Sequence, residues 1–170
     1  RLQATSGNMV TMQLVRQFGS YSGKKEIEAI AVDAELGYVY YSDETVGVRK
    51  YHADPDAADA NAELALFASD GFARDHEGIA IYKKTHGTGY ILVSDQQANS
   101  IRLYCREGTA ASPHEHRFVK TIRIAAQETD GLEVTSQSLA PAFPNGLLVA
   151  MSNGKVFHFY AWPDIAGKDL

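Results

Sequence analysis

EGIAI at residues 77–81, followed by GYILVSDQ at residues 89–96, is the stretch that decides the fold. An acidic residue opens a short apolar run, and a glycine then leads a second run of aromatic or aliphatic residues. The same arrangement occurs once before, as EAIAV and GYVYYSDE at 28–32 and 37–44, and once after, as DGLEV and GLLVAMSN at 130–134 and 146–153. Such self-similarity is typical of a repeat architecture.

Each copy continues with a third run in which polar and apolar residues alternate, as in a half-buried strand. These runs are VRKY at 48–51, IRLY at 101–104 and VFHF at 156–159. Further strand-like runs stand before the three copies: LVRQF at 14–18, LALF at 64–67 and FVKTIRI at 118–124. The sequence therefore predicts four strands per unit, with repeats near 14–51, 64–104 and 118–160.

The spacing of the copies predicts a β-propeller. The acidic residues at positions 28, 77 and 130 are 49 and 53 residues apart, close to the roughly 40 to 50 residues of a four-stranded blade. We expect an all-β chain in which residues 1–170 form about three blades of a propeller. A ring has typically about 4 to 8 blades, so another segment must cover the faces that three blades leave exposed. A β-sandwich with repeated strands is the alternative.

Composition and charge exclude several functions. The net charge is −5 and no basic stripe is present, which argues against binding to nucleic acid. No apolar stretch approaches the 18 or more residues of a membrane span. Cys105 is the only cysteine, so no disulfide can form within the chain.

Acidic residues recur at equivalent places in the three units. In a propeller the first strand of each blade lines the central channel, so Glu28, Glu77 and Asp130 are expected to converge. Oxygen-bearing side chains also follow each second strand, and Asp75 lies two residues before Glu77. A single acid of this kind is explained by turn chemistry or a solvated surface. Their recurrence in register favours a site for a hard cation such as calcium, which takes oxygen ligands.

Other chemistry has weaker support in the sequence. His114 and His116 flank Glu115 near a proline; such a pair can bind a transition metal, but a solvated loop is the simpler interpretation. Phosphate-binding loops of the Walker type, G-x-S-x-G elbows and Cys-x-x-Cys pairs are all missing from the sequence, and covalent catalysis therefore has no candidate nucleophile.

Four separated motifs resemble the β-propeller phytases of the 3-phytase type. They are EIEAIAVDAELGYVYYSDE at 26–44, DGFARDHEGIAIY at 70–82, GTGYILVSDQQ at 87–97 and TDGLEV at 129–134. The similarity runs from about Val15 through FPNGLLVAMSNG and AWPDI near the end of the chain. It implies the C-terminal half of a six-bladed ring whose channel holds several calcium ions, where water attacks phosphorus and releases phosphate from phytate, myo-inositol hexakisphosphate.

The resemblance also implies roles for individual residues. Those that bind calcium or shape the cleavage site would be Glu28, Glu44, Asp75, Glu77 and Gln96, with Asp130 as a further calcium ligand. Ala29 departs from the family pattern, which has glycine after the first acid, as at Gly78 and Gly131. The family's N-terminal signatures are absent, and with them several calcium ligands and most phosphate-binding basic residues. The candidate basic contacts, which spacing does not rank, are Arg16, Lys24, Lys25 and Arg49.

The partners implied by the resemblance are phytate and either the missing N-terminal blades or a second copy of the chain. A secreted or periplasmic location is expected, because phytases of this type are usually exported. The alternative function is that of a non-catalytic calcium-binding propeller fragment that acts as a binding module.

Overall fold

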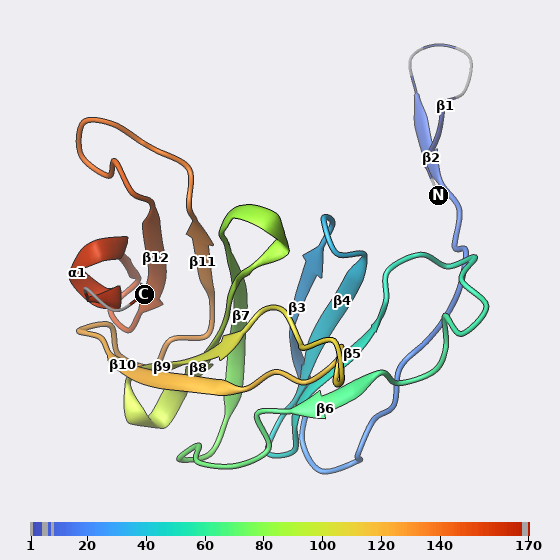
Figure 1. Ribbon diagram of the computed structural model, residues 1–170, viewed down its shortest axis with the longest axis horizontal. Coiled ribbons are helices and arrows are strands. Elements are labelled where there is room, and N and C mark those ends of the chain that lie inside the picture. The colour runs from blue at the N-terminus through green and yellow to red at the C-terminus, as the bar shows by residue number, and fades with distance from the viewer. Residues whose placement is uncertain (1, 5–6, 8, 168–169) are drawn as a thin grey trace.

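The computed structural model describes residues 2–4, 7, 9–167 and 170. It is nearly all β, as the sequence predicted, and most of its strands form three antiparallel sheets (Figure 1). One short α-helix, α1 (Trp162–Ala166), and two single 3-10 turns, η1 (Thr85–Gly87) and η2 (Gln96–Ala98), are the helical elements of this described part. No helix among the described residues is long and apolar enough to cross a bilayer.

Within each of the three sheets, strands that are consecutive in the sequence lie next to each other. The first sheet contains β3 (Ile27–Asp33), β4 (Tyr38–Asp43), β5 (Gly47–His52) and β6 (Ala65–Phe67). The second contains β7 (His76–Lys83), β8 (Gly89–Asp95), β9 (Ser100–Cys105) and β10 (Phe118–Arg123). The third contains β11 (Leu132–Thr135), β12 (Leu147–Ser152) and β13 (Val156–Ala161). The predicted strands within the three copies are confirmed to within about two residues, inside the usual uncertainty of strand ends.

The first strands of the three sheets lie together. β7 contacts both β3 and β11, and Figure 1 shows these strands at the centre of the molecule with the later strands of each sheet farther out. Successive four-stranded meanders that share a centre in this way are blades of a propeller. The prediction of a propeller fragment is confirmed, and the β-sandwich alternative is not.

The strands predicted to open the second and third units belong instead to the preceding sheets, where each is the outermost strand. β6 pairs with β5, with Phe67 opposite Val48, and β10 pairs with β9. Each outer strand thus completes the sheet that precedes it, so the sheets extend over 27–67, 76–123 and 132–161 rather than over the predicted repeats. The third sheet has three strands in the described chain.

The run LVRQF at 14–18, expected as a strand, is not one. Side chains fix this segment instead. Arg16 Nη2 donates to the carbonyl of His52 at 2.5 Å and Nη1 to that of Ala60 at 2.9 Å, while the Phe18 ring packs edge-on against Tyr51 at 5.3 Å. Before it, β1 (Leu2–Ala4) and β2 (Val10–Met12) pair as a hairpin; both strands are exposed and project from the sheets (Figure 1).

Apolar side chains fill the space between neighbouring sheets. One cluster, with Tyr40, Ile79 and Ile91, joins the first and second sheets. Another, with Leu103 and Leu148, joins the second and third sheets and includes Trp162 of α1. The propeller arrangement follows from this packing, because each sheet buries its apolar residues against the next one.

A fully buried ion pair also joins the first two sheets. Arg106 donates from Nε and Nη2 to the two carboxylate oxygens of Asp33, each at 2.6 Å, and both side chains are inaccessible to solvent. Asp33 ends β3, and Arg106 follows β9. A bidentate charged pair has a fixed geometry, so it holds β3 in place relative to the second sheet.

The two outer faces of the set of sheets are uncovered. Ile30 and Val32 of β3 are exposed on one side, and Phe157 and Phe159 of β13 are exposed on the other. Large apolar residues gathered on such faces typically mark a surface that another protein segment covers.

Candidate metal centre

The acidic residue that opens each of the first two sheets lies at a β-bulge. Pairing is irregular between Ile27 and Ile30 in β3 and between His76 and Ile79 in β7. At each bulge a backbone N–H turns to a serine of the neighbouring strand: Ala29 donates to Ser42 Oγ at 2.9 Å, and Gly78 to Ser94 Oγ at 2.7 Å. Bulges re-aim side chains, which here are those of Glu28 and Glu77.

The alanine at position 29 fits the bulge, because its N–H makes the same bond to serine that Gly78 makes. Gly78 is more constrained. A Cβ there would lie 3.1 Å from Leu132 Cδ2 and 3.2 Å from Leu132 N. Ala29, which departs from the expected glycine, therefore still makes the bulge contact that Gly78 makes.

The aspartates that end β4 and β8 hold the loops before the bulged strands. Asp43 accepts from Ser22 N–H at 2.9 Å and from its hydroxyl at 2.7 Å, and Asp95 accepts from Ala73 N–H at 3.0 Å. The carboxylates of Asp43 and Asp95 accept hydrogen bonds from these loops. The residues that follow them, Glu44 and Gln96, contribute their side chains to the candidate site.

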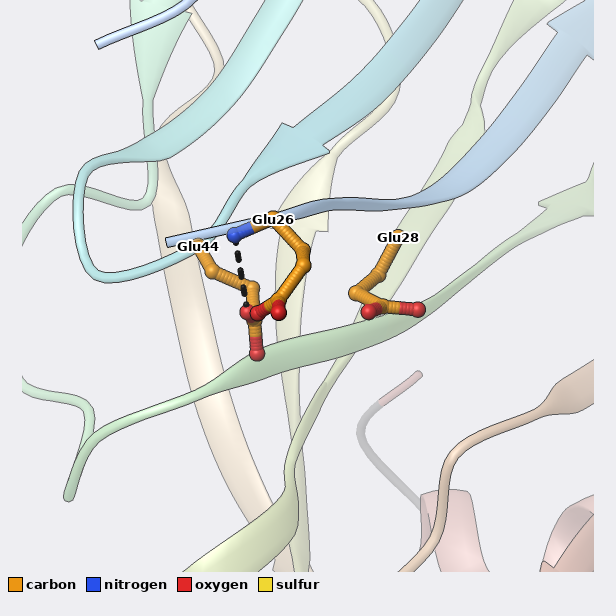
Figure 2. A group of neighbouring side chains, drawn as sticks. All are labelled: Glu26, Glu28 and Glu44. Atoms are coloured by element: carbon orange, nitrogen blue, oxygen red, sulfur yellow. Dashed lines mark hydrogen bonds between the residues drawn. The ribbon is translucent and has the colours of Figure 1, made fainter. Parts of the chain in front are cut away.

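Three buried carboxylates from the first two sheets meet at this place. Glu44, Asp75 and Glu77 are 1%, 3% and 8% exposed, and each offers an oxygen within 4.8 Å of the others. We call them the buried carboxylate group. Glu28 and Glu26 extend it toward solvent, since their carboxylates and that of Glu44 also come within 4.8 Å of one another. Figure 2 shows Glu26 and Glu44 side by side, with the bond from Glu26 N–H to Glu44 Oε2 at 3.2 Å.

A lysine ammonium bridges two members of the group. Lys25 Nζ lies 2.9 Å from Glu44 Oε1 and 3.0 Å from Asp75 Oδ2. The two carboxylates raise the pKa of Lys25 above its usual range through these hydrogen bonds. One positive charge thus lies among several negative ones.

Amide side chains continue the polar contacts toward the third sheet. Gln97 Nε2 donates to Asp75 Oδ2 and to Gln96 Oε1, each at 2.7 Å. Gln96 Nε2 in turn donates to Asp130 Oδ1 at 2.5 Å. Asp130 is exposed and lies outside the two carboxylate groups, so the third sheet reaches the site through Gln96.

Crowding of negative charge perturbs the protonation of the group. Burial raises the pKa of Glu77 to about 8, and proton sharing with Glu44 and the charges of Glu44 and Glu28 act in the same direction. Burial also opposes ionisation of Glu44, but hydrogen bonds from Glu77, Lys25 and Glu26 lower its pKa below the ordinary value. Closely spaced carboxylates behave in this way when no cation balances them.

The donor set fits a hard cation. The two groups contain carboxylate oxygens alone, the ligands that calcium prefers over the nitrogen and sulfur ligands of zinc. Asp75 Oδ1 is buried and has no hydrogen-bond partner in the described part of the chain, where Arg74 Nε lies 3.8 Å away. A buried carboxylate oxygen without a hydrogen bond is unusual, and a cation would satisfy it.

The six residues predicted for the site all belong to this connected region. Two residues that sequence reasoning did not name also contribute, Glu26 and Gln97, and Lys25, named only as an unranked basic contact, binds two of the carboxylates. The sequence could have identified Glu26, because it precedes Glu28 by two residues as Asp75 precedes Glu77. Lys25 reaches Asp75 across the boundary between the first two sheets, and Gln97, just after β8, reaches Asp75, just before the paired strand β7. A linear pattern reveals neither contact.

Two other basic residues that the sequence offered as phosphate contacts make different interactions. Arg49 pairs with Asp43 and Glu63 at 2.9 and 2.6 Å, and Arg16 binds backbone carbonyls. The histidine pair also lies apart from the carboxylates. His116 is buried against Phe67, with ring centroids 4.4 Å apart, and burial lowers its pKa to about 4.

Comparison with known proteins adds an independent result. A family model described as Phytase matches residues 3–158. The chain is also 29% identical over 173 residues to a curated relative, the 3-phytase of Bacillus subtilis strain 168. That alignment covers 92% of this chain and 43% of the relative, so the chain spans less than half the length of the curated relative.

Proposed function

The chain belongs to the phytase family, and from this premise we propose that the protein is a calcium-dependent phosphatase that releases phosphate from phytate. The observation that carries the proposal is the buried carboxylate group of Glu44, Asp75 and Glu77. A site this acidic repels a polyphosphate unless a cation lies between them. The chemistry of the site therefore calls for the cation as much as for the substrate.

Calcium would be held mainly by carboxylates of the two groups, which have Glu44 in common, with Gln96 and Asp130 beside them as further ligands. The residues proposed as its ligands are Glu28, Glu44, Asp75, Glu77, Gln96 and Asp130. When bound, calcium supplies positive charge that neutralises phosphate oxygens and lowers the pKa of water. Direct hydrolysis by water requires no protein nucleophile, which agrees with the lack of a nucleophile motif in the sequence.

The chain's own residues prepare the site in three ways. The bulges at Ala29 and Gly78 aim Glu28 and Glu77. The Gln97 amide fixes Asp75 and Gln96 relative to each other. Burial and the hydrogen bond with Glu44 raise the pKa of Glu77 to about 8, so Glu77 holds a proton near neutral pH that a divalent ion would replace as the source of charge balance.

We further propose that a second segment completes the ring, either the N-terminal blades of a longer phytase chain or a second copy of this chain. Support comes from the exposed faces of β3 and β13 and from the 43% coverage of the relative.

A non-catalytic calcium-binding module is the alternative, and the experiment below separates the two functions. Phosphate release from phytate is measured for the purified 170-residue chain in calcium and in excess chelator, together with its mass in solution. Calcium-dependent release supports the enzyme. Calcium binding without release, from a chain that has formed its ring, supports the binding module.

A secreted or periplasmic location is proposed on the family resemblance alone. Fractionation of the producing cells tests it: recovery of the protein with the cytoplasmic fraction would contradict it.

A further inference from the structure

The ammonium group of Lys25 lies where a cation shared by Glu44 and Asp75 would lie. Its Nζ is 2.9 Å from Glu44 Oε1 and 3.0 Å from Asp75 Oδ2. Both carboxylates are buried, whereas the lysine side chain is about one third exposed, at 33%. Lys25 therefore reaches into the buried carboxylate group from the solvent side.

Lys25 and a divalent ion cannot use these oxygens together. Calcium contacts its oxygen ligands at about 2.3 to 2.6 Å, and an ammonium hydrogen-bonded to the same oxygens would bring two positive charges into close contact at a cost of several kcal/mol. We propose that Lys25 is an internal counter-ion that competes with calcium for Glu44 and Asp75, and that calcium binding displaces its side chain toward solvent. This inference rests on the calcium site of the proposed function.

The local structure permits the displacement. Lys25 belongs to the irregular segment that precedes β3, and among the described residues its ammonium is held by the two carboxylates alone. A four-carbon stem with a single charge rotates freely once those bonds are lost. Lys24, the neighbouring residue, is exposed and carries the same charge, so it serves as a matched control.

The first test compares calcium affinities by calorimetry in chelator-treated protein. Lys25→Met keeps an unbranched four-atom stem and removes the ammonium, and we expect it to bind calcium about tenfold more tightly than the parent, which corresponds to about 1.4 kcal/mol. Lys24→Met removes an equal charge one residue away and is expected to change the affinity less than about twofold. Unchanged or weaker binding in Lys25→Met overturns the proposal.

The outcomes also separate this inference from the proposed function. Calcium binding by the parent with no gain in Lys25→Met removes the role of Lys25 and leaves the calcium site intact. Binding by Lys25→Met alone supports the competition, because the lysine then holds the parent's site closed. Failure of both proteins to bind calcium overturns the inference together with the calcium site.

The second test needs no variant. Amines of the parent protein are labelled by reductive methylation, with and without calcium, and the two lysines are followed by peptide mass spectrometry. An ammonium held by two carboxylates must leave them before it reacts, so Lys25 is expected to label several times more slowly than Lys24 in chelator and at a similar rate in saturating calcium. Slower or unchanged labelling of Lys25 on addition of calcium contradicts the displacement.

Discussion

Arg106 and Asp33 form a bidentate ion pair across the boundary between the first and second sheets, with both N–O distances at 2.6 Å and neither side chain exposed. Removal of one partner leaves an unpaired charge in the interior. We expect Arg106→Met to lower the free energy of unfolding by about 3 to 5 kcal/mol, measured by urea denaturation. The exposed Arg117 gives the control, since Arg117→Met is expected to cost less than about 0.5 kcal/mol.

A double variant, Asp33→Asn with Arg106→Met, separates the pair from its surroundings. It removes both charges, so we expect it to be more stable than Arg106→Met alone. If it is less stable, the unpaired carboxylate is not the source of the loss.

The hydroxyl of Ser94 holds the bulge beside Glu77 by accepting from Gly78 N–H at 2.7 Å. Ser94→Ala leaves that buried N–H without an acceptor, at an expected cost of about 1 to 3 kcal/mol in unfolding free energy. Calcium affinity is expected to fall as well, because the bulge aims Glu77. Ser112→Ala, at an exposed turn, is the control, and equal losses in the two variants would contradict the role of the bulge.

Gly78 and Gly131, which follow the acidic residues of the second and third units, are predicted to differ in how well they tolerate replacement by alanine. A Cβ at Gly78 would lie 3.1 Å from Leu132 Cγ, whereas a Cβ at Gly131 would meet nothing within 4 Å. We expect Gly78→Ala to destabilise the protein by about 1 to 3 kcal/mol through overpacking and Gly131→Ala to leave stability almost unchanged. Thermal unfolding of both variants checks this, and a larger loss in Gly131→Ala would exclude the steric explanation.

Protonation of Glu77 predicts a pH dependence of stability in chelator. Its pKa is about 8 in the folded protein, against 4.5 for an ordinary glutamate, so the folded state binds more protons than the unfolded state between these values. Stability is therefore expected to fall as pH rises from about 4.5 to about 8. Melting temperatures across this range test it: Glu77→Gln should show a flatter profile, and the exposed Glu115→Gln should match the parent.

Calcium is expected to abolish the same pH dependence. A bound divalent ion replaces the proton as the counter-charge, so the melting temperature in saturating calcium should no longer fall toward pH 8. A persistent fall in calcium would mean that the ion does not reach Glu77.

The exposed face of β13 predicts self-association of the chain. Phe157 and Phe159 are 67% and 61% exposed, so their replacement disturbs few internal contacts. Phe159→Glu is expected to shift the chain toward a monomer without loss of melting temperature, as measured by light scattering after size exclusion. Leu66→Glu, at an exposed position of β6, is the control, and an equal shift there would exclude a specific face.

The sheets were predictable because each unit carries its own local signals. The acid before an apolar run and the glycine before an aromatic run fix the first two strands, and alternation fixes the third. The outer strands were placed in the wrong units because short runs such as LALF at 64–67 carry no information about which neighbour they pair with. The run at 14–18 has the apolar pattern of a strand. It does not pair with a sheet, and the Arg16 guanidinium donates hydrogen bonds to backbone carbonyl groups instead.

The candidate site was predictable in part for the same reason. Repetition identified Glu28, Glu77 and Asp130 and drew attention to the residues after each second strand and to Asp75. The resemblance then singled out Glu44, Asp75 and Gln96 among them. The depth of burial was not predictable: Glu44 and Asp75 are almost inaccessible, whereas Glu28 and Asp130 are exposed. These differences arise from packing between sheets, as do the contacts of Lys25.

The two uncovered faces of the set of sheets belong to different strands, β3 at one end and β13 at the other. Identical copies that join through them therefore associate head to tail, through a heterologous interface. Two copies would form a closed ring only if a rotation of half a circle about the channel axis related one copy to the other, so that this axis was a two-fold axis. A turn that departed from half a circle would leave one face open at each end, and the copies would then add one after another into a filament.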